Sequence, residues 1–428
     1  MNLLLCLTLL GLIVINKFFN KQILYPSILV CIVFFLSSIL VYLNQSLWNF
    51  EVDEKTFFVI VISLILYSVG ANLGGRLVWK KQFYKTISED AIHFSRATVW
   101  VCTVLCILVD YLYYRKQINL ARVLGSSGGL EDMFFAIRSN MKIETDLYGL
   151  SIWMNIGIAF VRAFGYVCLF IVIYRLINKK SKNFRYIPPL FCLVICELLS
   201  SSRIGLIVFV SAIIFNAYFS LKKLNVNINR IIIKVAAVLI IIFFMAFYSF
   251  GTITGQSDVY SAWETISIYL GASIVCLDNY LLNPWPPSGI VGQYSFKGIN
   301  ALLRRFGADI PSYSNHLPNV YFGSVGSNIY TALFPFIHDY GILISFIIQL
   351  LLGVVFGFTW RLFNRADRIT LFTIIYGRFF GYAVCMYSIA ERLCSEYLAL
   401  NVFVEIFFYY IILKFLLRKE NIKDQCYG

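Results

Sequence analysis

Long apolar stretches separated by short polar connections run along the chain from end to end. The stretch "IIIKVAAVLIIIFFMAF", residues 231–247, is typical, since it holds one charge and no alternation of apolar and polar positions. About 20 such residues form a helix that crosses a hydrocarbon core about 30 Å thick. Strands of a membrane β-barrel would instead alternate at every second residue. The pattern therefore predicts an all-α polytopic membrane protein.

We expect about eleven transmembrane helices, within a range of roughly 10–12. They belong to a single integral membrane domain, residues 1–428. The expected spans are 3–15, 23–43, 57–74, 97–114, 151–176, 186–200, 204–221, 231–251, 342–363, 371–389 and 398–417.

Composition agrees with this prediction, and the charge pattern gives the helices a direction. Hydrophobic residues make up 60% of the chain and charged residues only 14%, against about 25% charged residues in soluble domains. Of the 36 lysines and arginines, 23 lie in alternate connecting segments, which the positive-inside rule assigns to the cytoplasm. The N-terminus is then outside and the C-terminus inside. The net charge of +14 needs no nucleic-acid partner to explain it.

Two connections are long, and both fall on the outer side: residues 115–150 and 252–341. Loops of this length are often functional. Within the second, residues 261–282 could form a further span. However, that span would carry Glu264 and Asp278, which are costly in lipid, and would move later basic segments outside. We therefore expect an interfacial or re-entrant helix there, and a short amphipathic helix over "GINALLRRFG", residues 298–307.

Among the outward basic residues, arginine outnumbers lysine nine to four. Arg203 stands out because "SSSRIG", residues 200–205, places it between two apolar runs. The planar fork of arginine suits a partly buried phosphate. The alternative is a structural arginine that snorkels or pairs with Glu197. Taken together, the outward arginines favour an anionic ligand at the membrane surface, and the candidates to bind it are Arg203, Arg138, Arg304, Arg305 and Arg392.

Familiar catalytic motifs are missing from the sequence. No HExxH, Walker A, GxSxG or dinucleotide-binding glycine pattern occurs. The eleven cysteines lie mostly within apolar spans without CxxC spacing, which is typical of small core residues. We expect no cofactor and no metal site.

The segment "SNIYTALFPFIHDYGILISFIIQLLLGVVFGFTWR", residues 327–361, resembles the oligosaccharide repeat-unit polymerases, the O-antigen polymerase (Wzy) family. In that family an Asn-x-Tyr-Thr stretch precedes an aromatic–Asp–aromatic–Gly turn and a membrane helix. His338 stands where the first aromatic residue is usual. The Ser-Arg of residues 202–203 is similar to the pair that begins a membrane helix in this family and in O-antigen ligases. The matching positions are Asn328, Tyr330, Thr331, Asp339, Tyr340 and Gly341.

The resemblance implies an enzyme of the bacterial inner membrane with its active site facing the periplasm. Both donor and acceptor would be glycan units linked to undecaprenyl pyrophosphate, and the product an O-antigen or capsule-type polysaccharide. Other partners would be membrane lipid and, in the same pathway, a flippase and a chain-length regulator. An acceptor hydroxyl would attack the anomeric carbon while undecaprenyl pyrophosphate leaves, without cofactor or metal.

This chemistry needs cations for the leaving pyrophosphate and a base for the hydroxyl proton. The resemblance implies that Arg203 contacts the pyrophosphate. Asp339 or His338 would be the base, beside Asn328 and Tyr330, although Asp339 could instead only cap the helix that follows. The next candidates for the base are Glu264, Asp278 and Glu391. Three alternatives stay open: an O-antigen ligase-like glycosyltransferase, a flippase or transporter of lipid-linked glycan, and a scaffolding membrane protein.

Overall fold

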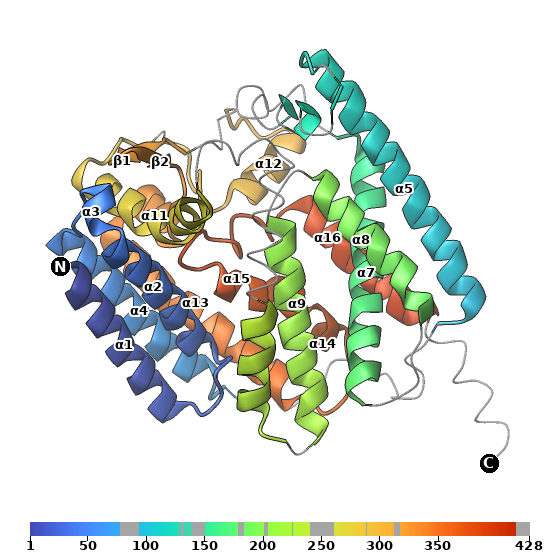
Figure 1. Ribbon diagram of the computed structural model, residues 1–428, viewed down its shortest axis with the longest axis horizontal. Helices are drawn as coiled ribbons and strands as arrows, with labels where there is room; N and C mark the ends of the chain where they lie inside the picture. The colour runs from blue at the N-terminus through green and yellow to red at the C-terminus, as the bar shows by residue number, and fades with distance from the viewer. Residues whose placement is uncertain are drawn as a thin grey trace. The chain divides into compact units, whose positions relative to one another are not determined.

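The computed structural model of the chain is mainly α-helical (Figure 1). Over the described residues, eight helices are long and apolar enough to cross a membrane. This agrees with a multi-pass helical membrane protein. The structure describes residues 1–77, 94–126, 128–129, 132–134, 136–137, 150–178, 184–200, 204–224, 226–239, 261–287, 289–311 and 317–416.

The chain divides into two compact units, which are described separately. The first unit comprises Met1–Lys81, Tyr260–Arg365 and Tyr382–Ala399. Its elements are α1 (Asn2–Phe19), α2 (Pro26–Leu43), α3 (Gln45–Trp48), α4 (Glu54–Gly74), α11 (Ala262–Leu282), α12 (Lys297–Arg305), β1 (Val320–Phe322), β2 (Val325–Ser327), α13 (Phe334–Arg365) and α15 (Tyr382–Cys385).

The second unit comprises Gln82–Val259, Ala366–Gly381 and Leu400–Gly428. Its elements are α5 (Arg96–Val123), α7 (Ile152–Ile177), η1 (Phe184–Tyr186), α8 (Ile187–Leu199), α9 (Ile204–Leu221), η2 (Lys222–Leu224), α14 (Leu371–Tyr376), the π-helix η3 (Gly377–Gly381), α16 (Leu400–Ile411) and the π-helix η4 (Ile412–Leu416).

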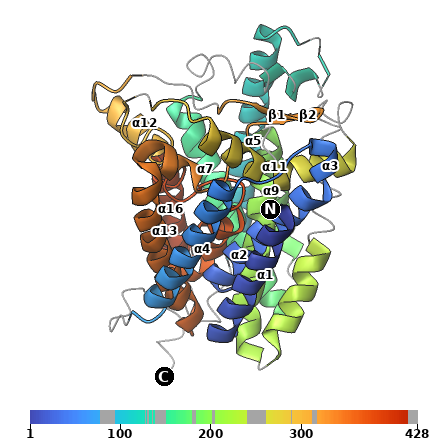
Figure 2. The same cartoon turned by 90° about the vertical axis from the view of Figure 1, so that its left-hand side faces the viewer.

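Helices α4 and α13 lie side by side in the first unit, as Figure 2 shows, because each carries a Gly-x-x-x-Gly pair. A Cβ at Gly70 or Gly74 would come within 2.0 Å of a carbonyl oxygen of α13, and one at Gly353 or Gly357 within 2.2 Å of a carbonyl oxygen of α4. Only glycine permits such close backbone contact, a packing mode common between membrane helices. This contact holds the core of the unit together.

Helix α11 lies across the ends of α2 and α4 that flank α3 (Figure 1). Near its start, Trp263 Nε1 donates to Asn44 Oδ1 at 3.0 Å. Near its end, the carbonyl of Leu281 accepts from Lys55 Nζ at 2.7 Å. A 21-residue helix is about 30 Å long. Because both of its ends contact the same ends of α2 and α4, α11 does not run along their length.

Two features of the chain after α12 differ from an uninterrupted helical pattern. Strands β1 and β2 pair antiparallel, so the described part of this otherwise helical protein includes a small hairpin. Helix α13 is bent at Gly341, whose φ of 82° is left-handed and costs glycine little. The bend separates a short helix containing His338 and Asp339 from the long apolar helix after residue 341.

The structure differs from the sequence predictions at several boundaries. The long loop predicted from residue 115 begins later, because α5 continues to Val123. Ile118 and Ala121 extend the apolar face of α5 and pack against Met133. Helix α8 has only 13 residues. The predicted span 231–251 is described to residue 239, and it is helical up to there.

Candidate anion-binding site

A charged cluster in the first unit forms where α12 begins. The turn before α12 is fixed by Asn300, whose Nδ2 donates to the carbonyls of Val291 and Gly292 at 3.1 and 3.2 Å. The N–H of Phe296 also donates to the carbonyl of Gly292, at 2.9 Å. These bonds set the position of Lys297, the first residue of the helix.

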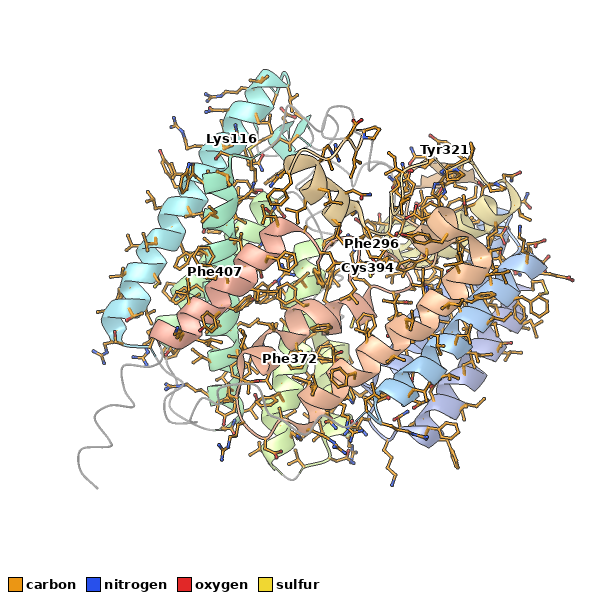
Figure 3. All side chains as sticks on the ribbon, turned by 180° about the vertical axis from the view of Figure 1, so that it is seen from behind. Lys116, Phe296, Tyr321, Phe372, Cys394 and Phe407 are labelled. Carbon is orange, nitrogen blue, oxygen red and sulfur yellow. The ribbon has the colours of Figure 1, made fainter. Side chains whose placement is uncertain are left out.

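Residues 390–399 lie against this end of α12. A Cβ at Gly298 would come 3.1 Å from the backbone of Leu398 and Ala399, so the absence of a side chain allows the two segments to touch. Figure 3 shows Phe296 and Cys394 close together at this junction. Residues far apart in the sequence therefore meet around Lys297.

The segment that supplies Arg392 is held to α13 at its start. The N–H of Ala332 donates to the carbonyl of Tyr387 at 3.0 Å, and the Tyr387 hydroxyl donates to Gln349 Oε1 at 2.5 Å. The Glu391 carboxylate then accepts from the N–H groups of Cys394 and Ser395, at 2.8 and 2.6 Å. A carboxylate that closes its own turn fixes the direction of the next residue, which is Arg392.

Lys297 is partly buried and has no hydrogen bond or ion pair to any described residue. Burial and, to a smaller extent, the like charge of Arg392 lower the pKa of Lys297 to about 8, while Glu391 acts in the opposite direction. Burial also raises the pKa of Glu391. The ammonium of Lys297 thus lies beside an arginine, and the nearby Glu391 carboxylate is bonded to backbone N–H groups.

Arg392 uses only part of its guanidinium within the protein. Its Nη1 pairs with Glu396, four residues later, and its Nε is buried without a hydrogen-bond partner among the described residues. A buried donor left unpaired costs free energy comparable to a lost hydrogen bond. Lys297 and Arg392 therefore form a pair of like charges with donors that have no partner among the described residues, and such a pair suits the oxygens of a phosphate or diphosphate.

Asp339 reaches the same turn from the short helix before Gly341. Its Oδ2 accepts from the N–H of Tyr294 at 3.1 Å, the N–H of Ser295 at 2.8 Å and the Ser295 hydroxyl at 2.7 Å. Its Oδ1 has only a long contact of 3.4 Å with the Tyr294 N–H. Asp339 thus anchors residues 294–295, whereas the sequence suggested a cap on the helix after it, and its Oδ1 is lightly bonded.

His338 is directed away from these groups. It is 5% exposed, and its Nδ1 lies 3.2 Å from the Tyr280 hydroxyl. The rings of Trp285, Tyr294 and Phe334 surround it, with centroids 5.0–5.7 Å from its own. No hydrogen bond between His338 and Asp339 is found in the described structure, so the expectation that Asp339 orients His338 has no geometric support.

The other residues predicted to bind substrate, where the structure describes them, lie near β2 and at the far end of α12. Tyr330 is buried, donates to the Pro318 carbonyl at 3.1 Å and packs on Phe334. Asn328 follows β2 directly. Arg304 and Arg305 occupy the last turn of α12, two turns from Lys297, with Arg305 exposed.

Arg203 and Arg138, the remaining predicted ligands of an anion, lie outside the described residues. Lys297 was not among the residues that the sequence predicted to bind an anion. One signal was available: "ERLCSE", residues 391–396, puts charges between two apolar runs, and Lys297 is the first residue of the amphipathic helix. Nothing in the sequence showed that these two segments touch.

Comparison of the chain with known protein families, with curated proteins and with solved structures finds no match. Over the described residues, no group of three or more His, Cys, Asp or Glu side chains is arranged to hold a metal ion. The charged cluster around Lys297 is therefore the feature of the chain that points to a function.

Proposed function

We propose that this chain is a membrane glycosyltransferase of the O-antigen polymerase type, which joins oligosaccharide units carried on undecaprenyl pyrophosphate. The observation that carries the proposal is the pair of cations at Lys297 and Arg392, whose donors are not all used by the described residues. A diphosphate is doubly suited to such a pair, because its charges offset the repulsion between the cations and its oxygens fill their donors.

In the proposed reaction, the acceptor hydroxyl oxygen forms a bond to the anomeric carbon of the donor sugar. The bond from that carbon to the phosphate oxygen breaks, and the electron pair leaves with undecaprenyl pyrophosphate. Lys297 and Arg392 stabilise the charge that develops on this leaving group. Asp339 takes the hydroxyl proton through its lightly bonded Oδ1, while its Oδ2 stays bonded to residues 294–295.

The proposed topology has about eleven spans, with the N-terminus in the periplasm of a bacterial inner membrane and the C-terminus in the cytoplasm. In this orientation the ends of α2 and α4 beside α3 face the periplasm. The contacts of α11 with those ends support an interfacial position for it. Cysteines introduced at Ser126 and Ser288, in a background cleared of native cysteines, should react with an impermeant thiol reagent in intact spheroplasts. Protection of both sites would overturn this topology.

The activity itself is tested in a strain that lacks this chain. A polymerase defect leaves surface glycan with a single repeat unit, whereas loss of a ligase or a flippase removes surface glycan altogether. Purified protein supplied with lipid-linked units should also produce a ladder of longer glycans and release undecaprenyl pyrophosphate. Surface glycan of normal length in the deletion strain would contradict the proposal.

A further inference from the structure

A separate hollow of about 280 Å³ lies in the second unit, at the end of α5. Helix α5 has 28 residues and is about 42 Å long, more than a hydrocarbon core about 30 Å thick requires. Its apolar part is followed by a polar end with Arg115, Lys116 and Arg122. The hollow opens beside this polar end, where Ser126, Gly128, Gly129 and Met133 lie against the helix. It is lined by Tyr114, Ile118, Ala121, Arg122, Ser126, Gly128, Gly129 and Met133.

The polar groups of this hollow are mostly donors. Arg122 has no hydrogen bond or ion pair to any described residue. The backbone N–H groups of Gly128 and Gly129 have no described acceptor, and Gly128 adopts a φ of 124°, which favours glycine. Ser126 adds a hydroxyl. A set rich in donors, with one permanent positive charge, fits a ligand rich in acceptors that carries a carboxylate.

The remaining wall is apolar, and the space is small. Ile118 and Met133 provide a hydrophobic surface, and Tyr114 adds a ring at the edge. The volume of about 280 Å³ lies just below the roughly 300–1,000 Å³ of typical ligand pockets, which suits a ligand of about one small ring. We propose that this hollow binds a single sugar ring that bears a carboxylate, with Arg122 on the carboxylate and the apolar wall on the ring. The choice of a sugar over another small carboxylate rests on the proposed function.

Binding to the full-length protein in detergent tests this proposal by saturation-transfer NMR. The probes are methyl glucuronide, methyl glucoside, which lacks only the carboxylate, and propionate, which lacks the ring. We expect the glucuronide to bind about tenfold more tightly than either of the others. Arg122→Gln should remove this preference, and Ser126→Trp should block the hollow. Lys116→Gln is the matched control, since Lys116 lies on the same end of α5 (Figure 3) but not in the lining.

Equal binding of the two glycosides, or an unchanged preference in Arg122→Gln, would overturn the assignment of the carboxylate. If propionate bound as tightly as the glucuronide, the proposal that the hollow recognises a sugar ring would be wrong. If Ser126→Trp does not fold, the result with Arg122→Gln still decides the matter. These outcomes are distinct from failure of the proposed function, because the deletion strain reports polymerisation whether or not the hollow binds a sugar.

Discussion

Charged side chains are buried or partly buried in both units, and two groups of them, one in each unit, differ in how their charge is compensated. In the second unit, two arginines each meet a glutamate through two hydrogen bonds. Arg162 bonds Glu197 at 2.9 and 3.0 Å, and Arg378 bonds Glu405 at 3.2 and 3.3 Å. In the first unit, Lys297 has no such partner among the described residues. We call a cation bonded to a carboxylate a closed pair and one without such a partner an open cation. In the sequence both are a basic residue near an apolar run, but a closed pair suits a structural role and an open cation suits ligand binding.

The closed pairs explain how the second unit tolerates charge among apolar helices. Each carboxylate occupies the guanidinium fork that a ligand phosphate would otherwise use. Arg378 also lies over the Tyr166 ring, with its Cζ 5.2 Å from the centroid. Both Arg162 and Arg378 belong to the nine arginines that the sequence places on the outer side, and their geometry is that of structural residues. Glu197, considered as a partner for Arg203, pairs with Arg162.

Breaking a closed pair should have the largest effect. Glu405→Gln leaves Arg378 charged and buried without its carboxylate, which costs about 3–5 kcal/mol of stability. We expect the protein level in membranes and the midpoint of thermal unfolding in detergent to fall together. The double variant Arg378→Leu with Glu405→Leu should restore much of this stability, because no uncompensated charge remains. A double variant as unstable as the single one would contradict the explanation by unpaired charge.

Removing a site cation should reduce turnover at nearly unchanged stability, because Lys297 has no described partner and the ion pair of Arg392 with Glu396 is partly exposed. Lys297→Gln and Arg392→Gln should each lower polymerisation by about 10²-fold, the magnitude typical for one lost group that stabilises transition-state charge. Protein level and unfolding midpoint should match the parent. Lys17→Gln, at an exposed position in the last turn of α1, is the control for loss of one positive charge. Normal turnover in both site variants would remove this cluster from the mechanism.

Variants at Asp339 can distinguish its role in anchoring residues 294–295 from a role in proton transfer. Asp339→Asn weakens the bonds to Tyr294 and Ser295, with an expected loss of about 1–3 kcal/mol. If Asp339 is also the base, turnover should fall more than tenfold even at a temperature where the variant is fully folded. The comparison is His338→Phe, which keeps an aromatic ring among Trp285 and its neighbours. A collapse of turnover in His338→Phe alone would transfer the role of base to His338.

The smallest effect concerns pH. Lys297 has a pKa lowered to about 8, so it loses its proton as the pH rises through that value. Only the protonated form attracts an anion, and inhibition by inorganic pyrophosphate should therefore weaken a few-fold above about pH 8. Lys297→Arg should keep inhibition constant to higher pH, since arginine stays protonated. The same pH profile in parent and variant would assign the titration to another group.

Much of the helical pattern could be predicted from the sequence. Helices α1, α2, α4, α7 and α9 follow the expected apolar runs closely, because apolar length is a local property that each segment carries by itself. Boundaries were predicted less well where packing extends a helix, as at residues 115–123 of α5. The bend at Gly341 and the hairpin of β1 and β2 likewise depend on neighbours in space.

The sequence alone determined that this protein is helical, apolar and arginine-rich on one predicted side. Only the tertiary structure decided which charges are compensated. Arg162 and Glu197 are 35 residues apart on different helices, and the turn at Glu391 meets α12 because Gly298 lets two backbones touch. Pairing of charges depends on distances across the fold, and no pattern along the chain encodes those distances. For this reason the sequence suggested an anion site in general terms, while the fold brought Lys297 and Arg392 together.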